Sequence, residues 1–77
     1  MLDRTRIESV SMGAGVVRYR VVLPAMKKRP RSLASDYETL QSACVAVKQC
    51  FQKDDVDPET VAMVEDKVPD GSWGQGS

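Results

Sequence analysis

Apolar residues recur at intervals of three and four through residues 35–53, in the stretch SDYETLQSACVAVKQCFQK. This spacing keeps side chains on one side of a helix with 3.6 residues per turn. Ser35 and Glu38 have the spacing of a capping box, in which the hydroxyl and the carboxylate each satisfy a free N–H at the helix start. The pattern therefore predicts one amphipathic helix over residues 35–53. Its apolar stripe is Tyr37, Leu40, Cys44, Val47 and Phe51, widened by Ala43, Ala46 and Cys50.

Two segments before this helix have the composition of strands. Residues 4–12 and 16–23 are rich in β-branched side chains, and Gly13-Ala14-Gly15 between them suits a turn. A three-residue loop would place Met12 opposite Val16 and Glu8 opposite Arg20. One face of this hairpin is then apolar and meets the helix, and we expect a Glu8–Arg20 ion pair on the other face. The apolar face carries Thr5, Ile7, Val17, Tyr19, Val21 and Leu23.

Residues 29–33 predict a short third strand. Because Pro30 has no N–H to donate to a neighbouring strand, we expect this strand at an edge of the sheet. The lysines and arginines around it would discourage pairing between sheets of different molecules, which is an alternative to a role in binding.

A second helix is expected to begin at Pro58, with Asp57 as its N-cap. Residues 54–56 would be a linker, and Pro69 would end the helix. Residues 1–68 then form one domain, and the Gly/Ser-rich residues 69–77 form a mobile tail. Trp73 in that tail either folds back on the domain or anchors another chain.

The chain has 77 residues, enough for a single small α+β domain: an antiparallel sheet packed on one helix, with a short second helix. A chain of this size buries only about 60% of the surface exposed by its unfolded state. Such a small core would gain stability from dimerisation or from docking on a partner, so a homodimer is one expectation.

Charge is unevenly distributed along the chain although the net charge is zero. Residues 1–33 hold eight basic and two acidic side chains, whereas residues 34–77 hold three lysines and nine acids. The asymmetry favours a polyanion or a charged protein as partner. The alternative is that the two halves pair with each other in the folded chain.

Several kinds of chemistry have no support in the sequence. There is no histidine, which removes the commonest general base and every histidine-containing zinc site. Cys44 and Cys50 would lie about 9 Å apart on one helix, too far for a disulfide. We therefore expect a protein without enzymatic activity, metal or cofactor. Two free thiols and the lack of a signal peptide or membrane-spanning stretch predict a cytoplasmic location.

The basic residues of the first half are the strongest candidates for function. Arginines at alternate strand positions can reach phosphates together, and a two-stranded ribbon fits a major groove. The candidate nucleic-acid-binding residues are Arg4, Arg6, Arg18, Arg20, Lys27, Lys28, Arg29 and Arg31.

The order of elements resembles the DNA-binding domains of phage integrase arms and plant ethylene-response factors. Two or three basic strands, the second containing Arg18-Tyr19-Arg20-Val21, precede a capped helix at Ser35. The resemblance implies a sheet in the major groove with the helix packed behind it. It would make Arg6, Arg18, Arg20 and Arg31 the groove contacts.

A second hypothesis comes from size and composition. The chain also resembles small phage-encoded inhibitors of host defence, such as anti-CRISPR proteins, which bind a host protein and block its nucleic-acid site. The acidic half could mimic phosphates toward such a partner. The candidate protein-binding residues are Asp54, Asp55, Asp57, Glu59 and Trp73, with Glu65 and Asp66 nearby in sequence. A third hypothesis is a small assembly subunit that oligomerises through its apolar helix edge.

Overall fold

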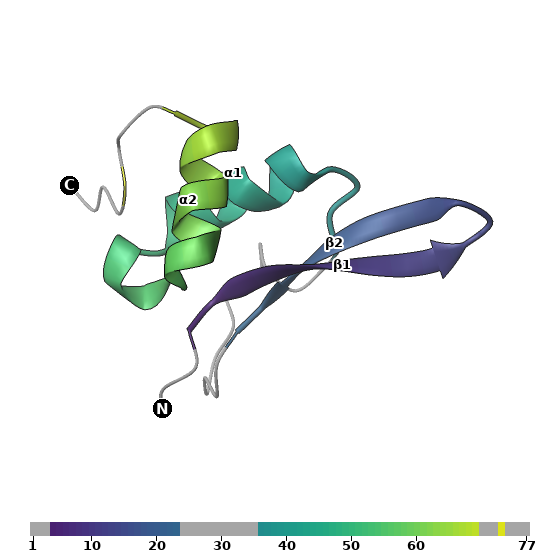
Figure 1. Ribbon diagram of the computed structural model, residues 1–77, viewed down its shortest axis with the longest axis horizontal. Coiled ribbons are helices and arrows are strands. Elements are labelled where there is room, and N and C mark those ends of the chain that lie inside the picture. Colours follow the sequence, from purple (N-terminus) through teal and green to yellow (C-terminus); the bar gives the residue numbers. More distant parts are fainter. Residues whose placement is uncertain (1–3, 24–35, 70–72, 74–77) are drawn as a thin grey trace.

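The computed structural model describes residues 4–23, 36–69 and 73. Within them, a two-stranded antiparallel sheet is followed by two helices, so the expected α+β class is confirmed (Figure 1). The strands are β1 (Arg6–Gly13) and β2 (Val16–Val22). The helices are α1 (Leu40–Cys50) and α2 (Pro58–Lys67), with the short 3-10 helix η2 (Lys53–Asp55) between them.

The hairpin has the expected register along most of its length. Glu8 pairs with Arg20, as the three-residue loop predicted. Near the turn the prediction is wrong, because Gly13 instead of Met12 lies opposite Val16, and the register shifts between Ser11 and Gly13. Met12 is the extra residue of this bulge. Gly13 and Gly15 both have positive φ angles, 88° and 78°, which glycine adopts without strain in a tight turn.

Single bridges extend the hairpin at both edges. The backbone N–H of Tyr37 donates to the Tyr19 carbonyl at 2.7 Å, and the Tyr37 carbonyl accepts the Tyr19 N–H at 2.8 Å. These two bonds place Tyr37 beside β2. Thr5 forms a parallel bridge with Val56: its N–H donates to the Asp55 carbonyl at 3.2 Å, and its carbonyl accepts the Asp57 N–H at 3.0 Å. Residues 54–56 are therefore regular structure instead of the expected linker: Asp54 and Asp55 belong to η2, and Val56 forms the bridge and is 0% exposed. The expected third strand, residues 29–33, lies outside the described residues.

Helix α1 begins later than its apolar periodicity predicted. Its N-cap is Thr39, whose hydroxyl accepts the Ser42 N–H at 3.1 Å. The expected capping box is wrong, because Glu38 precedes the helix, and Ser35 lies outside the described residues. The backbone bonds to Tyr19 hold Tyr37 in an extended bridge, so the helix cannot start before it. At its other end α1 stops at Cys50, with Phe51 as C-cap, instead of continuing to Lys53.

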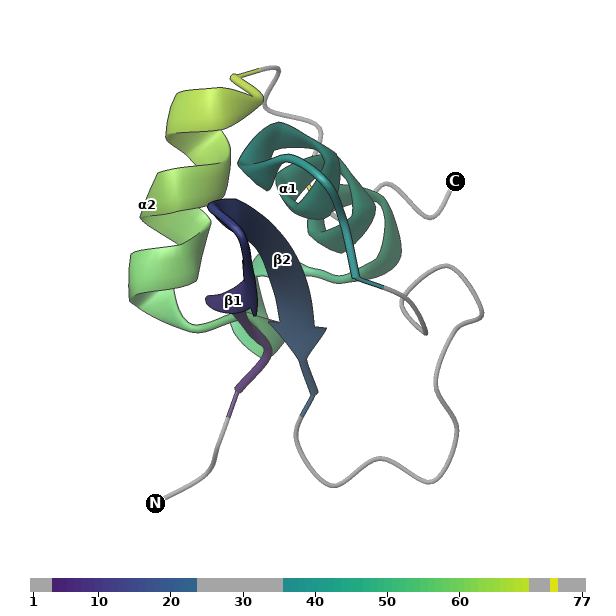
Figure 2. The same cartoon turned by 90° about the vertical axis from the view of Figure 1, so that its right-hand side faces the viewer.

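The core lies where α1 crosses the base of the hairpin. Figure 2 shows α2 on the left and α1 on the right, with the strands of the hairpin between and below them. Helix α1 packs on both β2 and α2, and its predicted stripe supplies much of the buried cluster. The buried apolar residues are Val21, Ala43, Cys44, Val47, Phe51, Val56 and Val64.

Helix α2 is capped at both ends. The Asp57 carboxylate accepts the Glu59 N–H at 3.1 Å and Pro58 occupies the first turn, as the sequence predicted. At the other end, the Lys48 ammonium donates to the Val68 carbonyl at 2.9 Å, although Lys48 is only 4% exposed. This bond ties the end of α2 to α1 and satisfies a carbonyl that the helix leaves free. Neither helix of the described chain is long and apolar enough to cross a bilayer.

Candidate nucleic-acid interface

Strand alternation gathers charged side chains on the side of the hairpin opposite the core. Val21 and its odd-numbered neighbours point toward α1, so the even-numbered residues point away from it. We call the resulting surface the arginine face, formed by Arg6, Glu8, Arg18 and Arg20. The structure thus brings together three of the eight arginines and lysines that the sequence nominated.

Arg6 and Glu8 form an ion pair within β1. The Arg6 Nε and a terminal guanidinium nitrogen both lie 3.0 Å from the same Glu8 oxygen, Oε2. The expected Glu8–Arg20 pair across the strands is therefore wrong, although these two residues do face each other in the register. Residues two apart on one strand share a face, and this gives Glu8 a nearer partner. Both side chains remain about half exposed.

Arg20 forms a two-pronged ion pair with Asp36. Its Nε donates to Oδ1 at 3.0 Å, and a terminal nitrogen donates to Oδ2 at 3.4 Å. This hydrogen bond raises the pKa of the Arg20 guanidinium and lowers the pKa of the Asp36 carboxyl. Because Asp36 immediately precedes the Tyr37 bridge, the pair also fixes the chain against β2 just before α1.

Arg18 has no ion-pair partner among the described residues. It is partly exposed on β2, and its positive charge contributes to the lowered pKa of Asp36. The arginine face together with Asp36 holds three arginines and two carboxylates, so its net charge is +1. Arg18 is therefore the arginine of this face whose charge no described carboxylate neutralises, although it is less exposed than Arg6 and Arg20.

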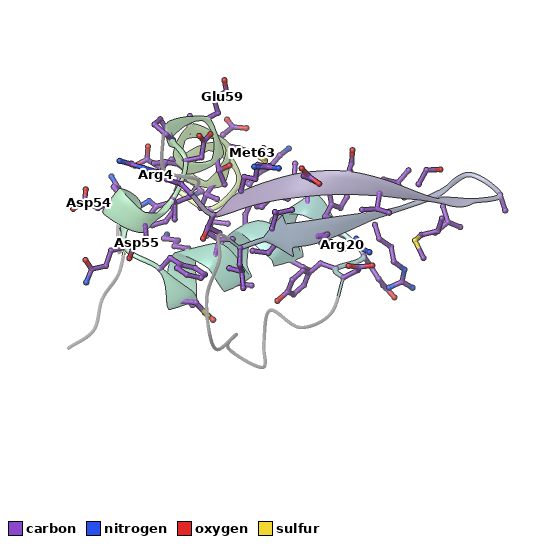
Figure 3. The ribbon with its side chains drawn as sticks, turned by 90° about the horizontal axis from the view of Figure 1, so that it is seen from below. Arg4, Arg20, Asp54, Asp55, Glu59 and Met63 are labelled. Atoms are coloured by element: carbon purple, nitrogen blue, oxygen red, sulfur yellow. The ribbon has the colours of Figure 1, made fainter. Side chains whose placement is uncertain are left out.

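The other nominated basic residues do not join this face in the described structure. Figure 3 shows Arg4 beside α2, near Glu59, while Arg20 lies farther along the hairpin. Arg4 is exposed and belongs to the chain before β1. The nominated residues Lys27, Lys28, Arg29 and Arg31 lie outside the described residues.

The turn end of the hairpin projects well beyond the helices (Figures 1 and 3). Three large apolar residues are exposed there: Met12 at 54%, Val16 at 47% and Val17 at 44%. The sequence had placed Val17 on the core-facing side, which its register supports, but α1 does not reach that far along β2. This exposed apolar end was not predicted from the sequence. The only indication of it in the sequence is that the hairpin is longer than the part of it that the helix can cover.

The nominated acidic residues lie at the opposite end of the molecule from the hairpin turn. Figure 3 shows Asp54, Asp55 and Glu59 there, around η2 and the start of α2. All three are exposed, whereas Asp57 is half-buried and serves as the α2 cap. The fold therefore gives the acidic segment a fixed backbone at one corner.

Trp73 packs against the core cluster. The Lys53 ammonium lies 6.0 Å from the centre of the indole ring, and the same ammonium is 2.7 Å from Glu65 Oε2. The indole N–H is buried and has no hydrogen-bond acceptor among the described residues. Of the two alternatives for this residue, the contacts fit a tryptophan folded back on the domain.

The structure offers little for other chemistry in the described ranges. No three histidine, cysteine, aspartate or glutamate side chains there are grouped closely enough to hold a metal ion. Both cysteines are free thiols, and burial raises the pKa of the Cys44 thiol, which disfavours the reactive thiolate.

Comparison with known proteins gives no relative for this chain: no family model, curated protein or solved structure matches it.

Proposed function

We propose that this protein is a non-catalytic binding protein that holds duplex nucleic acid against the arginine face of its hairpin. The observation that carries the proposal is Arg18, a cation without a carboxylate partner in the described structure, beside Arg20 on a ribbon that projects from the body. A two-stranded ribbon is narrow enough to lie in a groove of the duplex. Arg18 and Arg20 then lie on the surface that approaches the phosphates.

The Arg20–Asp36 pair supports this proposal through geometry. An arginine fork that already binds a carboxylate is oriented to bind a phosphate, which presents oxygens in a similar arrangement. Asp36 also limits affinity, because it neutralises one of the cations. We expect weak, largely sequence-independent binding that falls steeply with salt.

The direct test is fluorescence anisotropy of a labelled random-sequence duplex titrated with the protein, from low to physiological salt. Charge reversal at Arg18 (Arg18→Glu) is expected to abolish binding, because it replaces the one arginine of the face that has no carboxylate partner in the described structure with a carboxylate. Arg4→Glu is the matched control, with the same change of charge at a residue that lies apart from the face. Equal losses in the two variants would mean that only net charge matters and that the face does not.

The cytoplasm is the location that we propose for this activity. Both cysteines are free thiols, and one of them is buried in the core, which suits a reducing compartment.

A second candidate function, inhibition of a host nucleic-acid-binding protein, is supported by the acidic corner. Asp54 and Asp55 are exposed on an ordered 3-10 turn, so they could present carboxylates at fixed positions to a basic protein surface. A pull-down from host lysate with wild type and with Asp54→Lys/Asp55→Lys tests this function. A partner captured by wild type and by Arg18→Glu, and lost only in the acidic variant, would favour inhibition over nucleic-acid binding.

A further inference from the structure

The apolar end of the hairpin has a second unusual feature besides its exposure. Met12 is the extra residue of the bulge and the most exposed of the three apolar side chains there. Val16, across from Gly13, continues the same strand that carries Arg18. An exposed, unbranched apolar side chain thus lies at the projecting end of the ribbon, a few residues from Arg18.

Among the described residues, no packing contact of the core accounts for Met12. The buried cluster is built from α1, α2, Val56 and the base of the hairpin, and Met12 does not belong to it. A bulge twists a hairpin and redirects a side chain, and bulges are common beside binding sites. Exposed apolar residues at the end of a projecting ribbon cost solubility unless they meet a partner.

We propose that Met12 inserts between adjacent base pairs of duplex DNA as an apolar wedge and bends the duplex, an inference that rests on the proposed function. The charge near the hairpin end indicates what kind of partner binds there. Arg18 and Arg20, on the same strand as Val16, attract a polyanion to this end of the molecule. Among polyanions, duplex DNA can also bury an apolar side chain, in the space between two stacked base pairs. Methionine is among the side chains that proteins insert there, and insertion bends the duplex.

The Met12 wedge and the arginines contribute to different properties of the complex, which can be measured separately. Phosphate contacts set affinity and its dependence on salt, whereas the wedge sets the shape of the bound DNA. Replacement of Met12 should therefore leave most of the affinity and remove the bend. RNA duplexes are less suited to this contact, because their A-form geometry differs from that of B-DNA.

The test measures binding and bending on the same DNA. A short duplex carries a donor and an acceptor dye at its two ends; anisotropy of one dye reports binding, and energy transfer between the dyes reports the end-to-end distance. The variants are Met12→Gln, which keeps the length of the side chain but makes it polar, and Met12→Leu, which keeps an apolar wedge. Val17→Thr is the matched control, since it makes another exposed residue of the same hairpin end polar while keeping its shape.

The expected result is a rise in energy transfer when wild type, Met12→Leu or Val17→Thr binds, and no rise when Met12→Gln binds at saturation. Binding of wild type without any rise, or an equal rise with Met12→Gln, would overturn the wedge and leave the proposed function standing. No binding of wild type at low salt would overturn both, and the hairpin end would then be a surface for a protein partner.

Discussion

Two nitrogens of the Arg20 guanidinium donate to the Asp36 carboxylate, at 3.0 Å and 3.4 Å, although the two residues are 16 positions apart in the sequence. The contact lies on the arginine face, next to the place where Tyr37 joins the edge of β2. It therefore connects the sheet, the start of the helical half and the proposed binding surface. Two predictions depend on this one pair.

The first concerns stability at acidic pH. Because the pKa of Asp36 is lower in the folded chain than in the unfolded chain, the pair's contribution is fully present above the unfolded value of about 4. That contribution is lost as the pH falls toward the folded pKa. Urea denaturation of wild type and Asp36→Asn from pH 7 to pH 2 is the measurement. The two free energies of unfolding should converge as the pH falls, and a constant difference would contradict the assignment.

The second concerns affinity for DNA. Asp36→Asn removes the charge that neutralises Arg20 and raises the net charge of the surface by one. We expect tighter binding at low salt and a slope of log K against log salt that is steeper by about one unit. Titrations of both proteins at several salt concentrations measure this slope. Weaker binding by Asp36→Asn would mean that Asp36 serves to hold the arginine in place more than to compete with phosphate.

The hairpin and the second helix were predictable because their signals are local. The pairing of Glu8 with Arg20 followed from the turn length, and the cap at Asp57 followed from its position before Pro58. The start of α1 was not predictable in this way. The spacing of Ser35 and Glu38 indicated an earlier start, and the bridge between Tyr37 and Tyr19, which keeps the chain extended there, is a contact distant in sequence.

The site was predictable only in part, for the same reason. Alternation along the strands placed Arg18 and Arg20 on one face, and this is how the structure has them. The partner of Arg20 was missed, because Asp36 had been assigned to a helix end and its distance from Arg20 depends on the tertiary fold. The bulge that makes Met12 an extra residue of β1 is not revealed by the residue pattern.

A third prediction uses the buried hydroxyl of Thr5. Its Oγ1 is buried and has no hydrogen-bond partner in the described part of the chain, although the Thr5 backbone is fully engaged in the bridge to the chain around Val56. Thr5→Val keeps the shape of the side chain and removes an unsatisfied polar group, so we expect stabilisation by about 1 kcal/mol. Thr39→Val is the matched control with the opposite sign, because it removes the N-cap of α1 and should destabilise by about 1 kcal/mol. Thermal or urea denaturation of the two variants shows whether the free energy of unfolding rises for Thr5→Val and falls for Thr39→Val.

A fourth prediction concerns Lys48, which joins the two helices. Lys48→Met keeps most of the side chain's volume but leaves the Val68 carbonyl without its donor. We expect a loss of about 1–3 kcal/mol in the free energy of unfolding. Lys67→Met, at an exposed position, is the control and should change stability by less than about 0.5 kcal/mol. A Lys48→Met protein as stable as wild type would show that the bond does not hold the end of α2.

The central claim is that the arginine face binds nucleic acid, and the most direct measurement is the salt-dependent anisotropy titration of wild type, Arg18→Glu and Arg4→Glu on one duplex. The account predicts binding by wild type and Arg4→Glu that weakens steeply with salt, and loss of binding by a folded Arg18→Glu. No binding of wild type at the lowest salt, or equal binding by Arg18→Glu, would contradict it.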